Sequence, residues 1–268
     1  MNDQPIIFID SGIGGLPYAH FFHSRNKKET IVYIADRENF PYGPKPKEKI
    51  IELVLILIKK LCRLYDPKII TIACNTISVS AYSSIKEELS DLPLVGTFPA
   101  IIPAVKKSLK RRIGVIATQR SIEDPYIADI AAQYGPDCSV FTEAAPELVQ
   151  FIERRWINAD ETERLEAVKP WVKKFREKGV DILVLACTHF LILKEEFVNA
   201  AGSDIRIIDS LVGVTKQLES ILDEDEGKLR TNTEKETGER IMLVTGEGPV
   251  EMHHEKLCRH FGFTLAIV

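Results

Sequence analysis

Short apolar runs rich in β-branched residues recur along the chain, and longer amphipathic segments separate most of them. The runs lie at residues 6–9, 31–35, 69–73, 94–96, 113–117, 182–186, 205–208 and 241–244. Apolar positions with helical spacing lie at residues 47–64, 78–89, 121–134 and 160–178. Strands that are apolar on both faces and alternate with helices are typical of parallel sheets covered by helices on both sides. The pattern therefore predicts an α/β fold with mainly parallel sheets flanked by helices.

One strand pattern occurs twice with the same ending. Residues 69–76 read IITIACNT, and residues 182–189 read ILVLACTH. Each is an apolar run that ends in Ala-Cys and continues with two polar residues, so the repeat predicts two similar halves that present Cys74 and Cys187 at the carboxyl ends of strands. Open parallel sheets bind ligands outside those ends. Two such halves facing each other would place the thiols on opposite walls of one cleft.

Composition narrows the class of protein. The chain has 268 residues, of which 45% are hydrophobic, and this is enough for one large domain or two smaller ones. Its formal net charge of −4 argues against general nucleic-acid binding. The basic residues between positions 106 and 112 are interpreted as a solvated helix end before the next strand. No signal peptide is expected, and the most apolar stretch, residues 53–58, is too short to span a membrane.

The five cysteines, at positions 62, 74, 138, 187 and 258, are odd in number and contain no C-x-x-C spacing. Structural disulfides and a zinc site are therefore disfavoured, and a reducing compartment such as the cytoplasm is favoured. A cysteine after a strand is usually a small buried hydrophobe. The repeated setting of Cys74 and Cys187 makes that reading less favoured for this pair. Cys62 and Cys258 are expected in core or surface positions, and nothing near Cys138 would activate a thiolate.

Two thiols on opposite faces of a substrate suit racemisation. One thiolate removes the α-proton, and the opposite thiol returns a proton on the other face. Model cysteine titrates about 1.5 units above neutral pH, so modest tuning poises it for this role. His189 and Asp10 are the candidate tuning residues. Helix N-termini after each cysteine would favour the thiolate and supply N–H groups for a substrate carboxylate.

A glycine-rich turn follows the first apolar run, where residues 8–16 read FIDSGIGGL. Dinucleotide binding is the obvious alternative, with Asp36 ending the next run, but Pro17 replaces the last small residue of that fingerprint. A carboxylate at Asp10 would also repel a pyrophosphate. We favour a site at which Asp10 binds a substrate ammonium and Ser11 offers a hydroxyl. A tight turn with an Asx-type hydrogen bond is the plain alternative.

Four motifs in order resemble the glutamate racemases of the aspartate/glutamate racemase superfamily. They are DSGIGGL at residues 10–16, PYG at 41–43, ACNT at 73–76 and ACTH at 186–189. The resemblance runs from residue 6 to about residue 248 and includes the tail LVTGE at residues 243–247. Each motif alone is weak, but four in this order and spacing are specific.

The resemblance implies two pseudo-symmetric α/β domains with the active site in the cleft between them. The first would comprise residues 1–97 plus 209–268 and carry Cys74, and the second would comprise residues 98–208 and carry Cys187. It implies a racemase that interconverts L- and D-glutamate without cofactor or metal and supplies D-glutamate for peptidoglycan. The expected setting is cytoplasmic, with a small amino acid as substrate and no nucleic acid or membrane as partner; a homodimer is left open.

The resemblance also assigns site residues. Cys74 and Cys187 would transfer the protons, with catalytic assistance from Asp10, His189 and Glu153. The positions that match substrate-binding residues are Asp10, Ser11, Pro41, Tyr42, Gly43, Asn75, Thr76, Thr118, Ser121, Thr188 and His189.

The sequence departs from the family pattern at a few places. Ile77 stands where a small residue is more frequent, and Phe98 where an acidic one is. Phe190 and Leu191 replace a common Tyr-Pro, and two arginines follow Glu153 where a small residue is usual. These departures bear on pocket size, on the role of Glu153 and on the exact substrate.

Other functions stay open from the sequence. An aspartate or broad-specificity racemase would share the cysteine pair and differ in pocket depth. A decarboxylase of the superfamily would be expected to need only one of the two cysteines, and a non-catalytic binding protein would tolerate serine at either position. A pyridoxal-phosphate racemase would need a lysine in a recognisable setting, and no lysine here has one.

Overall fold

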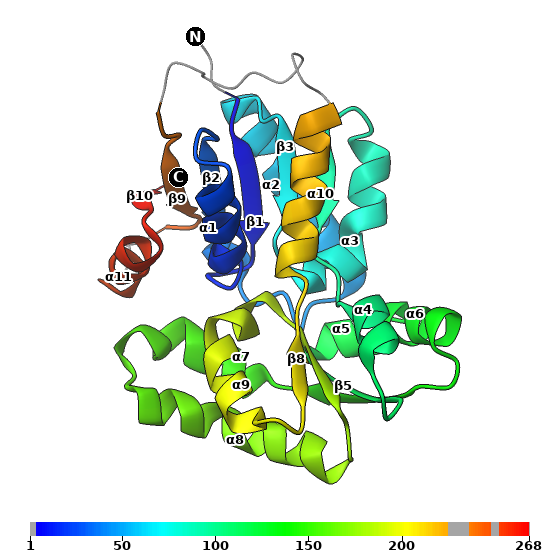
Figure 1. Cartoon of the computed structure of the whole chain (residues 1–268). Helices are drawn as coiled ribbons and strands as arrows, with labels where there is room; N and C mark the ends of the chain where they lie inside the picture. The colour runs from blue at the N-terminus through cyan, green and yellow to red at the C-terminus, as the bar shows by residue number, and fades with distance from the viewer. Residues whose placement is uncertain (1–3, 225–235, 248–251, 268) are drawn as a thin grey trace. The chain divides into compact units, whose positions relative to one another are not determined.

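The computed structural model describes residues 4–224, 236–247 and 252–267, and these residues form two compact units (Figure 1). Unit 1 comprises Met1–Thr97 and Leu211–Val268, and unit 2 comprises Phe98–Ser210. The chain returns to unit 1 after residue 210, whereas the sequence placed this boundary after residue 208.

Unit 1 is built on a six-stranded sheet with the order β10-β9-β2-β1-β3-β4, in which all pairings are parallel. Its strands are β1 (Ile6–Asp10), β2 (Ile31–Ala35), β3 (Ile69–Ile72), β4 (Leu94–Gly96), β9 (Arg240–Val244) and β10 (Thr264–Ile267). Its described helices are α1 (Leu16–Arg25), η1 (Arg37–Asn39), α2 (Lys47–Tyr65), α3 (Asn75–Glu88), α10 (Leu211–Glu224) and α11 (Met252–Phe261).

Helices cover both faces of this sheet. The helices α2 and α3 pack together on one face, and α1 packs with α10 on the other (Figure 1). Ile50, Val54 and Ile58 of α2 are fully buried in one cluster with Ile7 and Ile9 of β1. Burial on both faces explains why the central strands read as continuous apolar runs.

Unit 2 contains a four-stranded parallel sheet with the order β6-β5-β7-β8. Its strands are β5 (Arg112–Ala117), β6 (Ser139–Ala144), β7 (Ile182–Ala186) and β8 (Arg206–Ile208). Its helices are α4 (Ile101–Lys107), α5 (Gln119–Glu123), α6 (Tyr126–Tyr134), α7 (Pro146–Arg154), η2 (Trp156–Asn158), α8 (Glu161–Glu177), η3 (Thr188–Leu193) and α9 (Lys194–Ala201).

In unit 2, too, helices pack against the faces of the sheet. Ile101 of α4 and Ile127 of α6 pack on one face of the sheet, against Ile113 and Val115. On β5, a Cβ atom at Gly114 would lie 2.6 Å from the Phe175 ring of α8, so that position is restricted to glycine by close helix–sheet packing.

The two sheets repeat one topology. Unit 1 contains the order β2-β1-β3-β4, and unit 2 has the order β6-β5-β7-β8. Cys74 follows β3 and Cys187 follows β7, so the cysteines occupy equivalent places in the two units. The predicted fold of parallel sheets flanked by helices is confirmed.

The structure differs from the sequence prediction in two additional strands and in one predicted helix that is divided in two. All eight predicted strands form, but β6 and β10 were missed, and both are edge strands. The helix predicted at residues 121–134 is split because Asp124 is extended before Pro125, as the residue before a proline tends to be.

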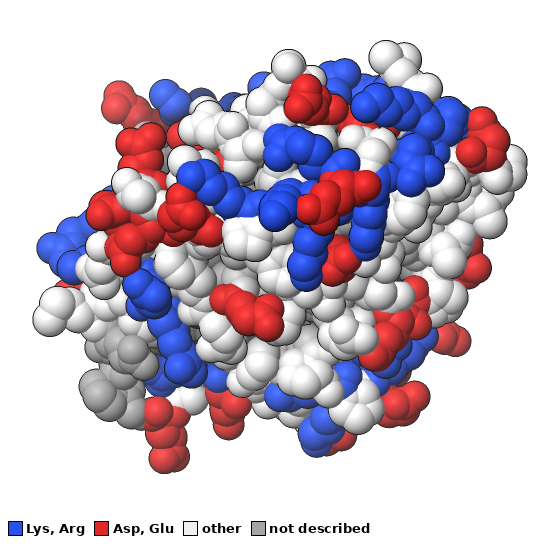
Figure 2. Space-filling view, turned by 90° about the horizontal axis from the view of Figure 1, so that it is seen from below, with Lys and Arg blue, Asp and Glu red and all other residues white. Residues whose placement is uncertain are grey.

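The surface is mixed in charge. Lys and Arg lie interspersed with Asp and Glu on the face seen from below (Figure 2). Lys106 and Lys107 are exposed at the end of α4, as expected for a solvated helix end. Among the described residues, no helix is both long and apolar enough to cross a membrane.

Candidate active site

The carboxyl edge of the unit 1 sheet carries Cys74, which is 5% exposed. The strand β3 ends two residues earlier, and Cys74 is the extended N-cap residue of α3, so this helix begins at Asn75, three residues before the start that the sequence pattern predicted. The next side chain, Asn75, is 2% exposed and donates from Nδ2 to the Thr97 carbonyl oxygen at 3.0 Å. This bond leaves Asn75 Oδ1 buried with no hydrogen-bond partner among the described residues. An unpaired buried acceptor at this edge suits a ligand with an N–H donor.

The glycine-rich turn brings Asp10 and Ser11 to the same edge. The Asp10 carboxylate accepts from the Gly12 N–H at 2.7 Å and from the Ser11 hydroxyl at 3.4 Å. The Asx-type hydrogen bond of the plain alternative is therefore present. It leaves the proposed role in substrate binding open, because a carboxylate has about four acceptor sites.

The side chain of Tyr33 makes two hydrogen bonds to the backbone of this turn. Its hydroxyl donates to the Gly12 carbonyl oxygen at 2.7 Å and accepts from the Gly15 N–H at 3.1 Å. A Cβ atom at Gly15 would lie 2.7 Å from Ala73 Cβ and 3.2 Å from Asp10 Cβ. Glycine at this position therefore lets the Asp10 turn lie against the strand end that leads into Cys74.

The segment Pro41-Tyr42-Gly43 follows a cis Phe40–Pro41 peptide bond. Tyr42 is 1% exposed, and its hydroxyl donates to the Asp36 carboxylate at 2.6 Å. Burial raises the pKa of Tyr42 above its ordinary value, and the charge of Asp36 and its hydrogen bond raise it further. The Tyr42 hydroxyl therefore stays protonated.

In unit 2, three side chains form a hydrogen-bonded row. Cys187 Sγ lies 3.7 Å from His189 Nδ1, and His189 Nε2 lies 2.6 Å from Glu153 Oε1. Cys187 and His189 are 4% and 3% exposed, and the Glu153 side chain is 11% exposed. The row links the η3 segment to α7.

The His189 imidazole is biased toward its charged form. Burial is the largest single influence and lowers its pKa, but the hydrogen bonds and charges of Cys187 and Glu153 together outweigh it. The pKa of His189 is therefore raised well above its ordinary value. A protonated His189 between Cys187 and Glu153 follows from this geometry.

Three further expected residues lie in unit 2. Ser121 is fully buried, and its hydroxyl lies 3.0 Å from the hydroxyl of Thr118, the N-cap of α5. Thr188 begins the segment after Cys187 and is 1% exposed. A helix N-terminus was expected after the turn at Cys187; the segment that follows Cys187 is the 3-10 helix η3, and the α-helix α9 starts at Lys194.

The departures from the family pattern have structural settings. Arg155 pairs with Glu163 at 2.8 Å, and Arg154 is exposed. The two arginines that follow Glu153 in the sequence therefore do not prevent its contact with His189 at 2.6 Å. Phe98 stacks on Tyr126 with ring centroids 5.1 Å apart.

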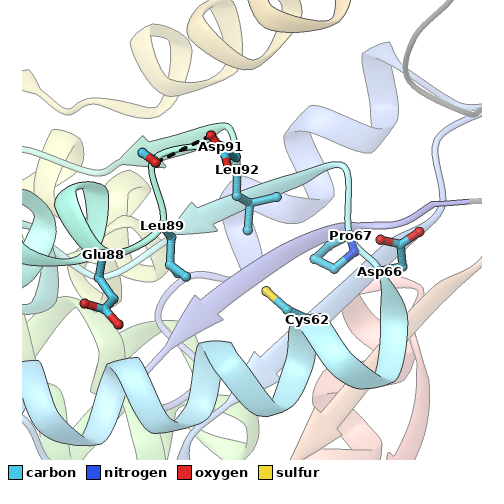
Figure 3. A pocket seen from close by; sticks show the side chains of 8 residues that line it. Cys62, Asp66, Pro67, Glu88, Leu89, Asp91 and Leu92 are labelled. Atoms are coloured by element: carbon cyan, nitrogen blue, oxygen red, sulfur yellow. Dashed lines mark hydrogen bonds between the residues drawn. The ribbon is translucent and has the colours of Figure 1, made fainter.

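The other three cysteines have different surroundings. Burial raises the pKa of the Cys62 and Cys138 thiols, and burial together with Glu255 raises that of Cys258 to about 11. Cys62 lines a pocket between α2 and the segment after α3 (Figure 3). Figure 3 shows no histidine or lysine among its lining residues, so nothing there favours a thiolate.

The described part of the chain holds no group of three or more His, Cys, Asp or Glu side chains suited to a metal ion. Asp36, considered for a nucleotide ribose, is 1% exposed and hydrogen-bonded to Tyr42 and Thr245. Its carboxylate is occupied by protein donors, which argues against a role in ribose binding.

Comparison with known proteins identifies the family. The model of the Asp/Glu/hydantoin racemase family matches residues 21–217, nearly three quarters of the chain. The chain belongs to the Asp/Glu/hydantoin racemase family. This match confirms the resemblance to the racemase family that the sequence motifs indicated.

Individual members of the Asp/Glu/hydantoin racemase family are similar over most of their length. The glutamate racemase of Treponema pallidum is 42% identical over 210 residues, which cover 78% of each chain. That of Sphingopyxis alaskensis is 35% identical over 225 residues, covering 82% of this chain and 83% of the relative. The crystal structure of Francisella tularensis glutamate racemase in complex with D-glutamate is 28% identical, with a TM-score of 0.79, and covers 100% of this chain and 98% of that one.

The structure gathers the predicted residues at one edge of each sheet. In unit 1 these are Asp10, Ser11, Pro41, Tyr42, Gly43, Cys74, Asn75 and Thr76; in unit 2 they are Thr118, Ser121, Glu153, Cys187, Thr188 and His189. Sequence reasoning missed Tyr33 and Thr245, and it considered Asp36 only within the dinucleotide-binding alternative that it disfavoured. The available signal for Asp36 and Thr245 was that each directly follows an apolar run.

Proposed function

We propose that this chain interconverts L- and D-glutamate without a cofactor, with Cys74 and Cys187 as its acid/base pair. The observation that carries the proposal is the repeated edge, in which equivalent strands β3 and β7 each lead into a cysteine followed by polar residues. Relatives named glutamate racemase, at 32–42% identity over more than three quarters of the chain, support glutamate as the substrate.

The proposed chemistry consists of two proton transfers. One thiolate takes the α-proton and becomes a thiol, and the C–H electron pair stays on the α-carbon. The other thiol gives its proton to the opposite face of that carbon and becomes a thiolate. The scheme requires both sulfurs to reach one carbon from opposite sides, and each turnover leaves the pair with exchanged protonation states.

The surrounding groups fit distinct tasks in this scheme. The protonated His189 supports a thiolate at Cys187, and Glu153 keeps the proton on His189. Asn75 Oδ1, which has no partner among the described residues, accepts from the substrate ammonium, together with Asp10. Backbone N–H groups at the start of α3, beginning with Asn75 and Thr76, receive the α-carboxylate. Ser11, Gly43, Thr118, Ser121 and Thr188 are proposed as further substrate contacts.

The proposed cellular role is the supply of D-glutamate for peptidoglycan in the cytoplasm. The two essential thiols require a reducing compartment, because oxidation would remove the base. The five cysteines form no disulfide with one another in the structure.

A chiral assay of the purified protein tests the proposal. L- and D-glutamate should each be converted to the other, and the mixture should approach equal amounts, because enantiomers have equal free energy in water. Aspartate should react at least about tenfold more slowly, because one missing methylene in a fitted pocket is worth roughly 1–3 kcal/mol. Faster turnover of aspartate would assign the chain to the alternative substrate, and no turnover of either would contradict a racemase.

A further inference from the structure

Ser78, in the first turn of α3, joins three elements of unit 1. Its hydroxyl donates to the carbonyl oxygen of Ile72, the last residue of β3, at 3.3 Å. The same oxygen accepts from the N–H of Thr97, directly after β4, at 2.9 Å. A serine hydroxyl has one proton, and Ser78 uses it on Ile72, so its oxygen faces Thr97 as an acceptor. The side chain is 1% exposed, and both bonds are therefore shielded from water.

Thr97 carries this connection to Asn75. The Thr97 N–H also donates to the Ile72 carbonyl oxygen at 3.1 Å, and the Thr97 carbonyl oxygen accepts from Asn75 Nδ2 at 3.0 Å. Thr97 is fully buried and is the last residue of the first segment of unit 1. The pairing of β4 with β3 ends at Gly96, so the position of the Thr97 carbonyl group depends on the two contacts of its N–H.

The orientation of the Asn75 side chain follows from its bond to Thr97. A carbonyl oxygen only accepts, so the NH₂ group of the amide must face Thr97, and the flipped amide would bring two acceptors together. Asn75 Oδ1 therefore lies on the opposite side of the amide plane from that bond. It is buried and has no hydrogen-bond partner among the described residues. The amide thus presents only an acceptor, which suits an N–H donor of a ligand.

We propose that Ser78 is a positioning residue that acts through Thr97 to fix the Asn75 amide with Oδ1 presented to the α-ammonium group of the substrate. The chain of hydrogen bonds runs from Ser78 Oγ to the Thr97 N–H and from the Thr97 carbonyl oxygen to Asn75 Nδ2. The inference rests on the proposed function, in which Asn75 binds the substrate ammonium. Ser78 itself does not touch the substrate, because both of its bonds are made to the protein.

This role predicts an effect on substrate binding and none on proton transfer. The ammonium group keeps its charge while the α-proton moves, so its contact with Asn75 contributes equally to the bound substrate and to the transition state. Loss of such a contact raises KM and leaves kcat unchanged.

The first test compares the kinetics of Ser78→Ala and Ser80→Ala. Ser78→Ala should raise KM for L- and D-glutamate about 3- to 10-fold, the size of one hydrogen bond, with kcat within about twofold of native. Ser78→Thr, which restores the hydroxyl, should return KM toward the native value. Ser80 is the matched control, because it lies in the same helix, is 3% exposed and has a hydroxyl without a partner among the described residues. Ser80→Ala should keep the native KM.

The second test uses a ligand without the ammonium group. Racemic glutamate and glutarate are compared by the concentration that halves the alkylation of Cys74 by iodoacetamide, a readout that needs no turnover. In Ser78→Ala this concentration should rise about 3- to 10-fold for glutamate and stay unchanged for glutarate, which has no N–H to donate to Asn75 Oδ1. In an Asn75→Ala background, Ser78→Ala should have little further effect on protection by glutamate.

An unchanged KM in Ser78→Ala would overturn the proposal, as would an equal loss of protection by glutamate and by glutarate, which would indicate a general structural role. Full additivity with Asn75→Ala would also contradict it. Should Ser78→Ala not fold, Ser78→Cys takes its place, because a thiol is only a weak donor and acceptor. Any of these results in a protein that racemises glutamate refutes this inference alone, whereas absence of racemisation in the native protein refutes the proposed function.

Discussion

Replacement of Glu153 by glutamine tests the row of side chains behind Cys187. The change keeps the shape of the side chain and removes its charge, so the His189 imidazolium loses its partner at 2.6 Å. Both side chains are at most 11% exposed, and solvent therefore screens this contact little. A hydrogen bond to a charged group is worth about 1.5–3 kcal/mol, which corresponds to a fall of about 10- to 150-fold in kcat/KM.

The loss should be equal in both directions. The equilibrium constant between enantiomers is one, and kcat/KM for L-glutamate and for D-glutamate must therefore fall by the same factor. Chiral chromatography of the reaction mixture, or a coupled assay specific for each enantiomer, measures kcat/KM in both directions. Glu147→Gln, in the first turn of the same helix α7 and exposed, is the matched control and should retain nearly full activity.

The deficit of Glu153→Gln should also depend on pH. Cys187 and Glu153 raise the pKa of His189 in the native protein, so the imidazolium persists as the pH rises past about 6.5, the ordinary value. In the variant the imidazolium is lost at lower pH. The deficit should therefore be largest at neutral and mildly alkaline pH and should shrink as acid restores the proton.

The stability difference between the native protein and Glu153→Gln should have the opposite pH dependence to the activity deficit. A raised folded-state pKa stabilises the fold fully below the unfolded value of about 6.5, and this contribution is lost as the pH rises through the folded-state pKa. The difference in unfolding free energy between native protein and Glu153→Gln should accordingly be larger near about pH 6 than near about pH 9. If Glu153→Gln kept the native kcat/KM, or if its loss of kcat/KM were the same at every pH, the assigned role of Glu153 would be refuted.

Further predictions concern the thiols and the glycine turn. Cys74→Ala and Cys187→Ala should each lower racemisation by about 10²–10⁴-fold, whereas Cys62→Ala should retain activity in the same chiral assay. Iodoacetamide should inactivate the native protein with modification of both proposed acid/base cysteines, and glutamate should protect them; modification that glutamate does not slow would contradict their place in the site. Gly15→Ala should destabilise the fold by about 1–3 kcal/mol in denaturant unfolding, because its Cβ would lie 2.7 Å from Ala73 Cβ; native stability would show that the turn can shift.

Local sequence patterns predicted the elements whose residues are buried on both faces. The strands β1, β3, β5 and β7 are continuous apolar runs because helices cover both sides of each sheet. The edge strand β6 was not predicted because its side chains are half-exposed, and a half-exposed strand need not be continuously apolar. The helical spacing over residues 121–134 predicts one helix, but Pro125 divides it, because the residue before a proline disfavours the helical conformation.

Contacts between distant segments were beyond such patterns. The Cys74 and Cys187 edges could be predicted because each cysteine directly follows a recognisable strand. The contact of Glu153 with His189 joins residues 36 positions apart, and only family resemblance pointed to it. The bond from Thr245 to Asp36 spans 209 positions, and no local motif connects β9 to the Tyr42 segment. Sheet order, which the strand patterns leave open, decides that contact.

Hydrogen exchange at the α-carbon tests the two-thiol account most directly. The reaction starts from L-glutamate in deuterated water, and mass spectrometry of the separated enantiomers is done at low conversion. Because the thiol that delivers the proton has already exchanged with solvent, the D-glutamate formed should carry deuterium while the remaining L-glutamate stays largely protonated. Starting from D-glutamate, the same asymmetry should appear with the enantiomers reversed. Product that keeps its original α-hydrogen in both directions would contradict Cys74 and Cys187 acting as an opposed pair.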